Sequence, residues 1–221
     1  MENNAKKIAR AALDIQAVRL QPDDPFTWTS GYRMPIYNDN RLFLFYPQYR
    51  ELICEAFAGL ITEASIPCDL IAGTPTAGIP HAVLLADKLK KPFIYPRKQQ
   101  KEHGMKNKIE GIKHPDMIRE KHVLMIEDLI STGKSSVEAI ETVRSAGAKV
   151  NCCLSIFSYG FDKAHQAFLD AEAQYRSLIT LETLIELVEE KEYFNPEQIG
   201  LLREWQRSPF TWGDRFKEKE I

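Results

Sequence analysis

The chain has 221 residues, of which 44% are hydrophobic and 27% charged, with a formal net charge of −2. Because a chain of this length and composition can bury a sizeable core, we expect residues 1–221 to form a single domain. The slight negative charge argues against a dedicated nucleic-acid binder, and no apolar run approaches the roughly 18 residues that span a bilayer.

The N-terminal segment is charged and amphipathic, and its pattern predicts a helix over about residues 2–20. It does not resemble a secretory signal, so a cytoplasmic location is expected. Four cysteines lie among apolar residues and lack CxxC spacing: Cys54, Cys68, Cys152 and Cys153. They are expected to be buried, reduced thiols rather than metal ligands.

Residues 21–46 are rich in proline, aromatic residues and glycine, which predicts short strands and turns in a small subdomain. Residues 47–65 return to helical periodicity. Beyond them, the patterns predict strands at 69–72, 92–96, 122–127, 149–157 and 175–179, and helices at 77–90, 134–146 and 162–172. Strands alternating with helices imply right-handed crossovers and a mainly parallel sheet.

The last part of the chain, from about residue 183, is expected to be a helical C-terminal extension. Asn195 and Pro196 are typical of an N-cap followed by the first helical residue. The tail beyond them carries no signal of a site.

The stretch at residues 122–136 carries most of the functional information. Five residues suited to a buried strand run into Glu127 and Asp128, and a polar turn follows before a helical pattern begins. In α/β proteins ligands bind at the carboxyl edge of the sheet, where these acids are expected. The turn offers hydroxyls and backbone N–H groups that suit a phosphate, from Ser131, Thr132, Gly133, Lys134 and Ser135.

The sequence of this stretch allows two other interpretations. Gly133-Lys134-Ser135 resembles the end of a Walker A loop, but that motif needs a glycine five positions earlier, where this chain has Asp128. A purely structural turn, with the acids capping the next helix, is the other interpretation. Two adjacent acids joined to a Ser-Thr-Gly turn favour a sugar-phosphate site over both.

Residues 97–108 contain five Lys or Arg and one Glu, a strong local positive charge in a slightly acidic chain. The absence of apolar periodicity predicts a long exposed loop, and such loops often act as lids. A solvated run of charge is the alternative. As a lid, Arg97, Lys98, Lys101 and His103 would close over a polyanion and neutralise a departing phosphate.

A third segment belongs to the same predicted sheet edge. The turn at residues 72–80 has glycines that permit close backbone approach, and Thr74 and Thr76 add hydroxyl groups. Such a turn is common without any function, so it counts only together with the other two segments.

Taken together, these segments resemble the type I phosphoribosyltransferases. The acidic stretch is similar to that family's signature for phosphoribosyl pyrophosphate (PRPP). The Arg-Lys-x-x-Lys-x-His-Gly loop at 97–104 resembles the orotate phosphoribosyltransferase branch, as do the Ser-Gly-x-x-x-Pro element within 29–37 and the segment 108–111. The resemblance covers roughly residues 20–160. It implies a mainly parallel central sheet flanked by helices, with a small N-terminal hood subdomain at about 21–46.

The resemblance also implies the reaction and the residues that serve it. Orotate would displace pyrophosphate from PRPP, giving orotidine 5′-phosphate in pyrimidine (UMP) synthesis. The resemblance assigns catalytic roles to Lys101, His103 and Asp128. PRPP binding falls on Arg97, Lys98, Lys101, His103, Glu127, Asp128, Leu129, Ile130, Ser131, Thr132, Gly133, Lys134 and Ser135. Mg²⁺ would be held through PRPP and water near Glu127 and Asp128, with no direct protein metal site.

On the side of the base the chain departs from the better-known branch of the family. That branch has a lysine before the Ser-Gly element, a second lysine in the diphosphate turn, and an orotate-contacting arginine after the strand that follows the PRPP motif. This chain has Thr29, Ala77 and the run Phe157–Phe161 there. Ser131 would touch orotate, and Arg33 or backbone N–H groups are candidates for its carboxylate.

Family members usually form homodimers, so a homodimer whose 97–108 loop serves the neighbouring site is expected, with no nucleic-acid or membrane partner. Two other functions stay open. A phosphoribosyltransferase for another base would keep residues 123–135 but would not need the basic loop. A PRPP-binding regulator without catalysis would share the fold, and it would often add a basic surface that this chain lacks.

Overall fold

The structure is a computed structural model, and it describes residues 3–28, 30–97 and 108–219. Within these ranges the central sheet has the strand order β10-β9-β8-β5-β6-β7. Its strands are β5 (Leu70–Gly73), β6 (Phe93–Pro96), β7 (Ile109–Glu110), β8 (His122–Ile130), β9 (Lys149–Ser158) and β10 (Gln174–Thr180). Neighbours pair in parallel except β6 and β7, which are antiparallel. The prediction of a mainly parallel sheet is confirmed.

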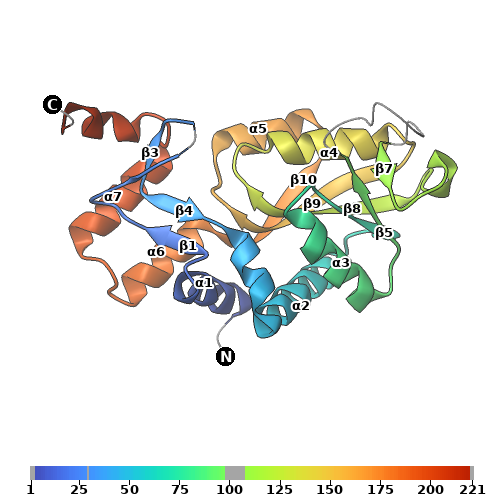
Figure 1. Cartoon of the computed structure of the whole chain (residues 1–221), viewed down its shortest axis with the longest axis horizontal. Coiled ribbons are helices and arrows are strands. Elements are labelled where there is room, and N and C mark those ends of the chain that lie inside the picture. Colours follow the sequence, from blue (N-terminus) through green and yellow to red (C-terminus); the bar gives the residue numbers. More distant parts are fainter. Residues whose placement is uncertain (1–2, 29, 98–107, 220–221) are drawn as a thin grey trace.

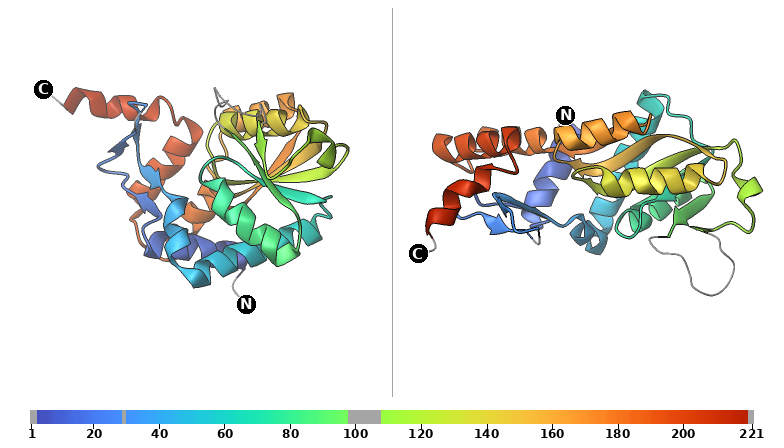
Figure 2. Two further views of the ribbon diagram at one scale, coloured as in Figure 1. Left: turned by 45° about the vertical axis from the view of Figure 1, so that its right-hand side comes forward. Right: turned by 90° about the horizontal axis from the view of Figure 1, so that it is seen from above.

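Helices cover both faces of the sheet, as Figure 1 and Figure 2 show. On one face lie α4 (Lys134–Arg144) and α5 (Asp162–Asp170), and on the other lie α1 (Asn4–Asp14), α2 (Pro47–Glu63) and α3 (Gly78–Leu89). A short 3-10 helix, η2 (Pro115–Met117), precedes β8. These helices match the predicted ranges except at the end of α1.

The sheet separates two apolar cores. Met125, Ile140 and Phe168 belong to the core under α4 and α5, while Phe57 and Phe157 belong to the larger core under α1, α2 and α3. All five side chains are buried. Full burial of a side chain of this size stabilises the fold by about 1.5–3 kcal/mol, so the two cores hold the sheet edge in place.

The hood contains the short strands predicted within residues 21–46, and these form antiparallel pairs. β1 (Val18–Leu20) pairs with β4 (Ile36–Asn38), and β2 (Phe26–Thr27) pairs with β3 (Arg33–Met34). The 3-10 helix η1 (Asn40–Phe45) then leads the chain back to α2. Asp39 caps η1 by accepting a hydrogen bond from the backbone N–H of Arg41 at 3.2 Å.

The C-terminal extension packs against the hood. It consists of α6 (Leu181–Glu190), α7 (Pro196–Arg207) and η3 (Trp212–Lys219). α6 lies on α1, and η3 lies on β3, so chain segments from both ends meet in this part of the molecule (Figure 1). The buried Trp205 of α7 donates its indole N–H to Met34 Sδ at 2.9 Å. Asn195 caps α7, as predicted.

The predicted helix over residues 2–20 is wrong at its C-terminal end. α1 stops at Asp14, and Gln16 adopts a positive φ of 58°, which turns the chain out of the helix. Val18–Leu20 then forms β1. Ala17 and Val18 are buried, as an amphipathic helix would require, but the hood strands bury them instead. The periodicity alone does not separate these alternatives.

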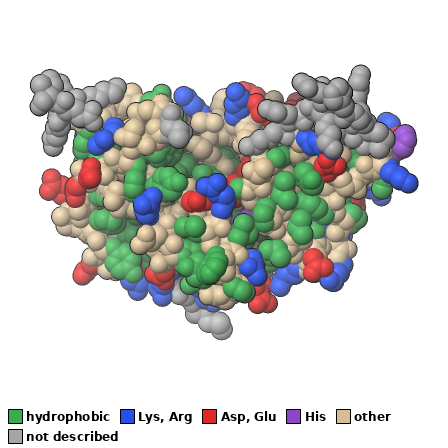
Figure 3. All heavy atoms as spheres, in the orientation of Figure 1, with side chains coloured by type: hydrophobic (Ala, Val, Ile, Leu, Met, Phe, Trp, Pro, Cys, Tyr) green, Lys and Arg blue, Asp and Glu red, His purple; other side chains and the backbone are tan. Residues whose placement is uncertain are grey.

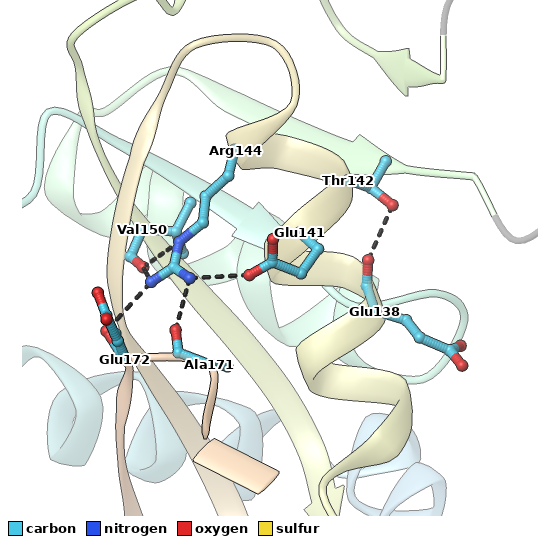
Figure 4. A network of polar contacts seen from close by, with 7 residues as sticks. All are labelled: Glu138, Glu141, Thr142, Arg144, Val150, Ala171 and Glu172. Atoms are coloured by element: carbon cyan, nitrogen blue, oxygen red, sulfur yellow. Dashed lines mark hydrogen bonds and ion pairs between the residues drawn. The ribbon is translucent and has the colours of Figure 1, made fainter. Parts of the chain in front are cut away.

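The side chain of Arg144 connects α4 with β9 and with the turn after α5, as Figure 4 shows. The guanidinium of Arg144, in the last turn of α4, donates hydrogen bonds to the carbonyl oxygens of Val150, Ala171 and Glu172. It also donates to Glu141 Oε1 at 2.8 Å. Arg144 therefore fixes the end of α4 against the start of β9 and the turn between α5 and β10.

Candidate functional site

The two adjacent acids lie within β8 rather than at its end. The sequence predicts a strand over 122–127, but pairing with β9 continues through Leu129 and Ile130. Pairing with β5 ends earlier, at Ile126. Glu127 and Asp128 are therefore held in a strand that projects beyond its other neighbour, which places them at the carboxyl edge of the sheet as expected.

Glu127 points into the protein and is only 4% exposed. Its Oε2 accepts a hydrogen bond from Ser136 Oγ at 3.1 Å, and its Oε1 accepts one from the backbone N–H of Asp128 at 3.0 Å. Burial, together with the neighbouring Asp128 carboxyl, raises the pKa of Glu127. Glu127 thus keeps its proton to a higher pH than an exposed glutamate, while Asp128 is the more accessible acid.

The polar turn after β8 has the form expected of an anion site. Gly133 is the N-cap residue of α4, and its φ of 78° places it in the left-handed region that glycine adopts without strain. A Cβ there would lie 3.3 Å from the ring of Phe168. Lys134 and Ser135 begin the helix and are exposed. The alternative interpretation, in which the acids cap α4, is wrong, since no side chain caps this helix.

The turn after β5 lies against the acidic strand. Gly78 opens α3, and a Cβ added there would be 2.5 Å from the carbonyl oxygen of Ile126 and 3.2 Å from Cα of Glu127. The Thr74 N–H donates to that same carbonyl at 2.9 Å. The Thr74 hydroxyl is buried and has no hydrogen-bond partner among the described residues, whereas Thr76 is exposed.

Of the predicted basic loop, only its two ends belong to the described residues. Lys98, Lys101 and His103 lie outside them. Arg97 follows β6, its backbone N–H donates to Lys108 O at 2.9 Å, and its guanidinium pairs with Glu110 of β7. A short antiparallel pairing of β6 with β7 thus forms the base of the loop.

A half-open cavity of about 530 Å³ brings the three predicted segments together. It is lined by Thr74 from the turn after β5, by Arg97 from the end of β6, and by Ser135 and Glu138 of α4. Asp128 is not among its lining residues. Arg97 Nη1 is buried there without a hydrogen-bond partner among the described residues. A cationic guanidinium, a hydroxyl and a helix N-terminus around one cavity suit an anionic ligand.

The side predicted to receive the base is aromatic. Tyr159, which stands near the position of the family's arginine, is 2% exposed and stacks on Phe161 with ring centroids 5.1 Å apart. The ring of Trp28, in the hood, also lies against Tyr159, with ring centroids 5.5 Å apart. Arg33 contacts Thr27 and Asp24 within the hood. Thr29 lies outside the described residues.

Sequence reasoning missed three partners of the predicted residues. Ser136 binds Glu127, Glu110 pairs with Arg97, and Asn40 donates its side-chain amide to the carbonyl oxygen of Asp128. An acid in an otherwise basic segment was a signal for Glu110. Neither Ser136 nor Asn40 stands out in the sequence, because both contacts depend on the packing of other elements against β8.

Among the described residues no helix is long and apolar enough to cross a membrane. Within the same residues, no three or more His, Cys, Asp or Glu side chains gather closely enough to hold a metal ion. The four cysteines are free thiols, of which Cys54 and Cys153 are buried and the other two are half-buried.

The class of protein follows from the fold, the acidic strand and the phosphate turn. The family model described as "Phosphoribosyl transferase domain" matches residues 47–182, a range that contains the central sheet and all three segments around the site. The fold is that of a type I phosphoribosyltransferase.

Full-length relatives identify the branch. An orotate phosphoribosyltransferase of Listeria innocua is 42% identical over 208 residues, which cover 94% of this chain and 98% of the relative. The structure of orotate phosphoribosyltransferase from Aeropyrum pernix is similar at a TM-score of 0.70 and 25% identity, covering 85% of this chain and 99% of the other. The chain belongs to the orotate phosphoribosyltransferase family.

A third similar structure is that of Mycobacterium tuberculosis orotate phosphoribosyltransferase in complex with PRPP. Its TM-score is 0.62 at 21% identity, and the match covers 82% of this chain and 98% of that one. At this identity the likeness concerns the fold alone.

Proposed function

We propose that this protein transfers the phosphoribosyl group of PRPP to orotate, giving orotidine 5′-phosphate and pyrophosphate. Membership of the orotate phosphoribosyltransferase family supports the reaction, and the resemblance of residues 123–135 to the PRPP signature supports the donor substrate. The observation that carries the proposal is that the 131–135 turn directly follows the strand that holds Asp128, and that Ser135 of this turn shares a cavity with Arg97.

On the ribose side, Asp128 accepts hydrogen bonds from the sugar hydroxyls. Its carboxylate lies beside the buried Glu127 carboxyl, and this proximity contributes to the raised pKa of Glu127. As N1 of orotate approaches C1 of the ribose and the bond to the diphosphate breaks, positive charge develops on the sugar. A nearby carboxylate stabilises that charge.

On the phosphate side, the 131–135 turn binds the 5-phosphate of PRPP. Gly133 allows the chain to curve without a side chain, and the free N–H groups at the start of α4 point to the ligand. The aligned peptide dipoles of the helix add a partial positive charge at this end. Leu129 and Ile130 carry the strand into the turn and contribute backbone groups.

The departing diphosphate is met by the basic loop. Arg97 supplies a guanidinium at the site cavity, and Lys98, Lys101 and His103 complete the set from the part of the loop outside the described residues. Each well-placed donor stabilises the developing negative charge by about 3 kcal/mol. His103 protonates the leaving group.

Mg²⁺ fits the residues present as an ion held mostly by the substrate. It prefers oxygen ligands and usually keeps several waters beside one or two carboxylates and substrate phosphates. Asp128 offers such a carboxylate, while both oxygens of Glu127 already accept hydrogen bonds. When bound, the ion would neutralise charge on the diphosphate.

On the base side, Ser131 contacts orotate, and Arg33 or backbone N–H groups receive its carboxylate. Ser131 is half-buried at the end of β8. The aromatic cluster around Tyr159 and Trp28 forms an apolar wall near the position of the family's arginine. Such a wall would favour a flat ring over an additional charged contact.

We also propose a homodimer whose 97–108 loop reaches the neighbouring site. Large apolar side chains are exposed on η1 and α3: Leu42, Phe45 and Val83, of which Phe45 is 82% exposed. Figure 3 shows apolar side chains among the charged ones on the face that carries η1, α2 and α3. An exposed apolar patch of this kind is typical of an interaction surface.

The free cysteines support a cytoplasmic location, because thiols stay reduced there.

A spectrophotometric assay with PRPP, Mg²⁺ and a panel of bases tests the proposal. Consumption of orotate, but not of uracil or adenine, is the expected result. Consumption of adenine alone would contradict the acceptor and leave PRPP as the donor. No consumption of any base, with PRPP binding intact, would favour a regulator.

Asp128→Asn is expected to lower kcat by about 100-fold, because the amide loses the negative charge that faces the developing positive charge. Stability should change little, since Asp128 is only half-buried. Asp87→Asn, in the exposed last turn of α3, is the matched control and should keep full activity. Normal turnover by Asp128→Asn would contradict the site. Lys101→Ala tests the loop in the same assay.

A further inference from the structure

At Asp128, strand β8 has no neighbouring strand on the side of β5. β5 pairs with β8 only as far as Ile126, whose carbonyl accepts the Thr74 N–H. After that point the chain turns towards α3, and Thr74 O accepts the N–H of Gly78 instead. In the parallel ladder the backbone groups of Asp128 would face this vacated side, because alternate residues bond to the same neighbour.

Two side chains satisfy the backbone of Asp128 in place of a strand. Its N–H donates to Glu127 Oε1 at 3.0 Å, and its carbonyl oxygen accepts the Nδ2 amide of Asn40 at 2.7 Å. Asn40 lies 88 positions away, at the start of η1. A side chain of the hood segment thus takes the place of a backbone donor at the site.

Asn40 is rigidly held. It is fully buried, the preceding Asp39 caps η1, and the Asp39 N–H donates to Ala17 O at 2.7 Å. At the other end of η1, the Leu44 carbonyl accepts Nη1 of Arg50 in α2 at 2.5 Å. A donor held from both sides fixes the position of its acceptor.

The stability of the fold alone does not explain why residue 40 is an asparagine. Its Oδ1 is buried and has no hydrogen-bond partner among the described residues. Leaving a buried polar atom unpaired opposes what the single amide bond contributes, so the net effect on unfolding should be small. A residue with little net effect on stability, bonded to the backbone of the site carboxylate, points to a role in the site.

We propose that Asn40 is a positioning residue that sets the orientation of Asp128 towards the ribose of PRPP. The inference rests on the proposed function, which assigns the ribose to Asp128. Without the amide, the Asp128 carbonyl loses its partner on the side that β5 has left, and only the pairing of Leu129 with β9 still orients this peptide. The direction of the Asp128 carboxylate is then less tightly fixed. Misplacement by about 1 Å can lower a rate by about 100-fold.

The test uses Asn40→Ala and Asn40→Asp in the full chain. Alanine removes the donor, while aspartate keeps the shape but places a second acceptor against the carbonyl of Asp128. Both variants are expected to raise the KM and Kd for PRPP about tenfold and to leave the KM for orotate within about twofold. KM and Kd do not depend on the fraction of enzyme that is folded, so lost stability alone would not change them.

Ser177→Ala is the matched control. Its hydroxyl lies 2.6 Å from that of the fully buried Ser155, so the variant likewise leaves a buried polar group without its partner. The substituted residue itself lies on β10, which is separated from β8 by β9. We expect lower stability with an unchanged KM for PRPP. A KM and Kd for PRPP within twofold of wild type in both Asn40 variants would overturn the inference.

The Kd for PRPP, measured by calorimetry, separates this inference from the proposed function. Wild-type protein that binds PRPP but does not consume orotate refutes the proposed reaction and leaves Asn40 testable. In that case a weaker Kd in both variants still supports the positioning role, and an unchanged Kd overturns it.

Discussion

His81 illustrates how one side chain can set the acid limit of the whole fold. It lies in α3, it is 1% exposed, and neither ring nitrogen has a hydrogen-bond partner among the described residues. Burial lowers its pKa from 6.5 to about 4. The native state therefore holds this histidine neutral over a range in which the unfolded chain binds a proton.

His81 is expected to lower the stability of the fold as the pH falls from 6.5 to 4. In this window its imidazole binds a proton in the unfolded state but not in the native state, so its contribution to the free energy of unfolding rises with pH and levels off below 4. At about 1.4 kcal/mol per pH unit, this contribution is about 3 kcal/mol. The raised pKa of Glu127 contributes a slope of opposite sign, so the effect of His81 is measured as the difference between wild type and His81→Leu in urea denaturation at a series of pH values. The same pH dependence in both proteins would contradict the role of His81.

The two adjacent acids show where sequence reasoning at the residue scale ends. That Glu127 and Asp128 belong to one ligand-binding edge was predictable, because an apolar strand runs directly into them. That Glu127 turns inward to Ser136 was not predictable. The difference depends on α4 packing over β8, which a pattern of neighbouring residues does not contain.

At the scale of elements, regular periodicity predicted the sheet and its helices well. The predicted ends of elements are wrong where one sequence pattern suits more than one structure. Residues 15–20 could extend a helix, but the hood strands offered a partner for Val18–Leu20. β8 continued past its predicted end because β9 runs alongside it to Ser158. Partners distant in sequence decided both boundaries.

Arg144→Met should destabilise the fold by about 2–4 kcal/mol. The substitution removes hydrogen bonds to three carbonyl oxygens and leaves the half-buried ends of α4, β9 and α5 without their shared donor. Chemical denaturation gives the value.

Arg119→Met is the control for Arg144, because its partner Asp116 is exposed and such surface pairs contribute about 0–1 kcal/mol. If the two substitutions lowered the free energy of unfolding equally, the role of Arg144 in connecting the three elements would be contradicted.

At the scale of the whole molecule, the proposed homodimer depends on the apolar face of η1 and α3. Phe45→Glu should produce a monomer, since a charge at the centre of an apolar interface must be desolvated without a partner. Sedimentation analysis measures the mass. Leu169→Glu, at an exposed apolar residue of α5 on the other face of the sheet, is the control and should leave the assembly unchanged. A dimer in both variants would place the interface elsewhere.

The part of the candidate site that we propose for the phosphate could be predicted from the sequence, and the part that we propose for the base could not. A strand, a turn and a helix start have local signatures, so the geometry of residues 127–135 was predictable. The proposed base side combines the hood, the end of β9 and α7, which meet only in the folded molecule. Trp205, for example, contacts Tyr159 from a helix that carried no signal of a site.

The meeting of both chain ends at the hood has a consequence for synthesis on the ribosome. The buried face of α1, which includes Ile8 and Ala12, packs against α2, β10 and α6. Of these only α2 is synthesised soon after α1, whereas β10 and α6 follow more than 150 residues later. Lys6 likewise pairs at 2.5 Å with Glu190, which is synthesised late. The nascent chain therefore carries a partly uncovered apolar helix until α6 has emerged, which makes this helix a point of contact for chaperones.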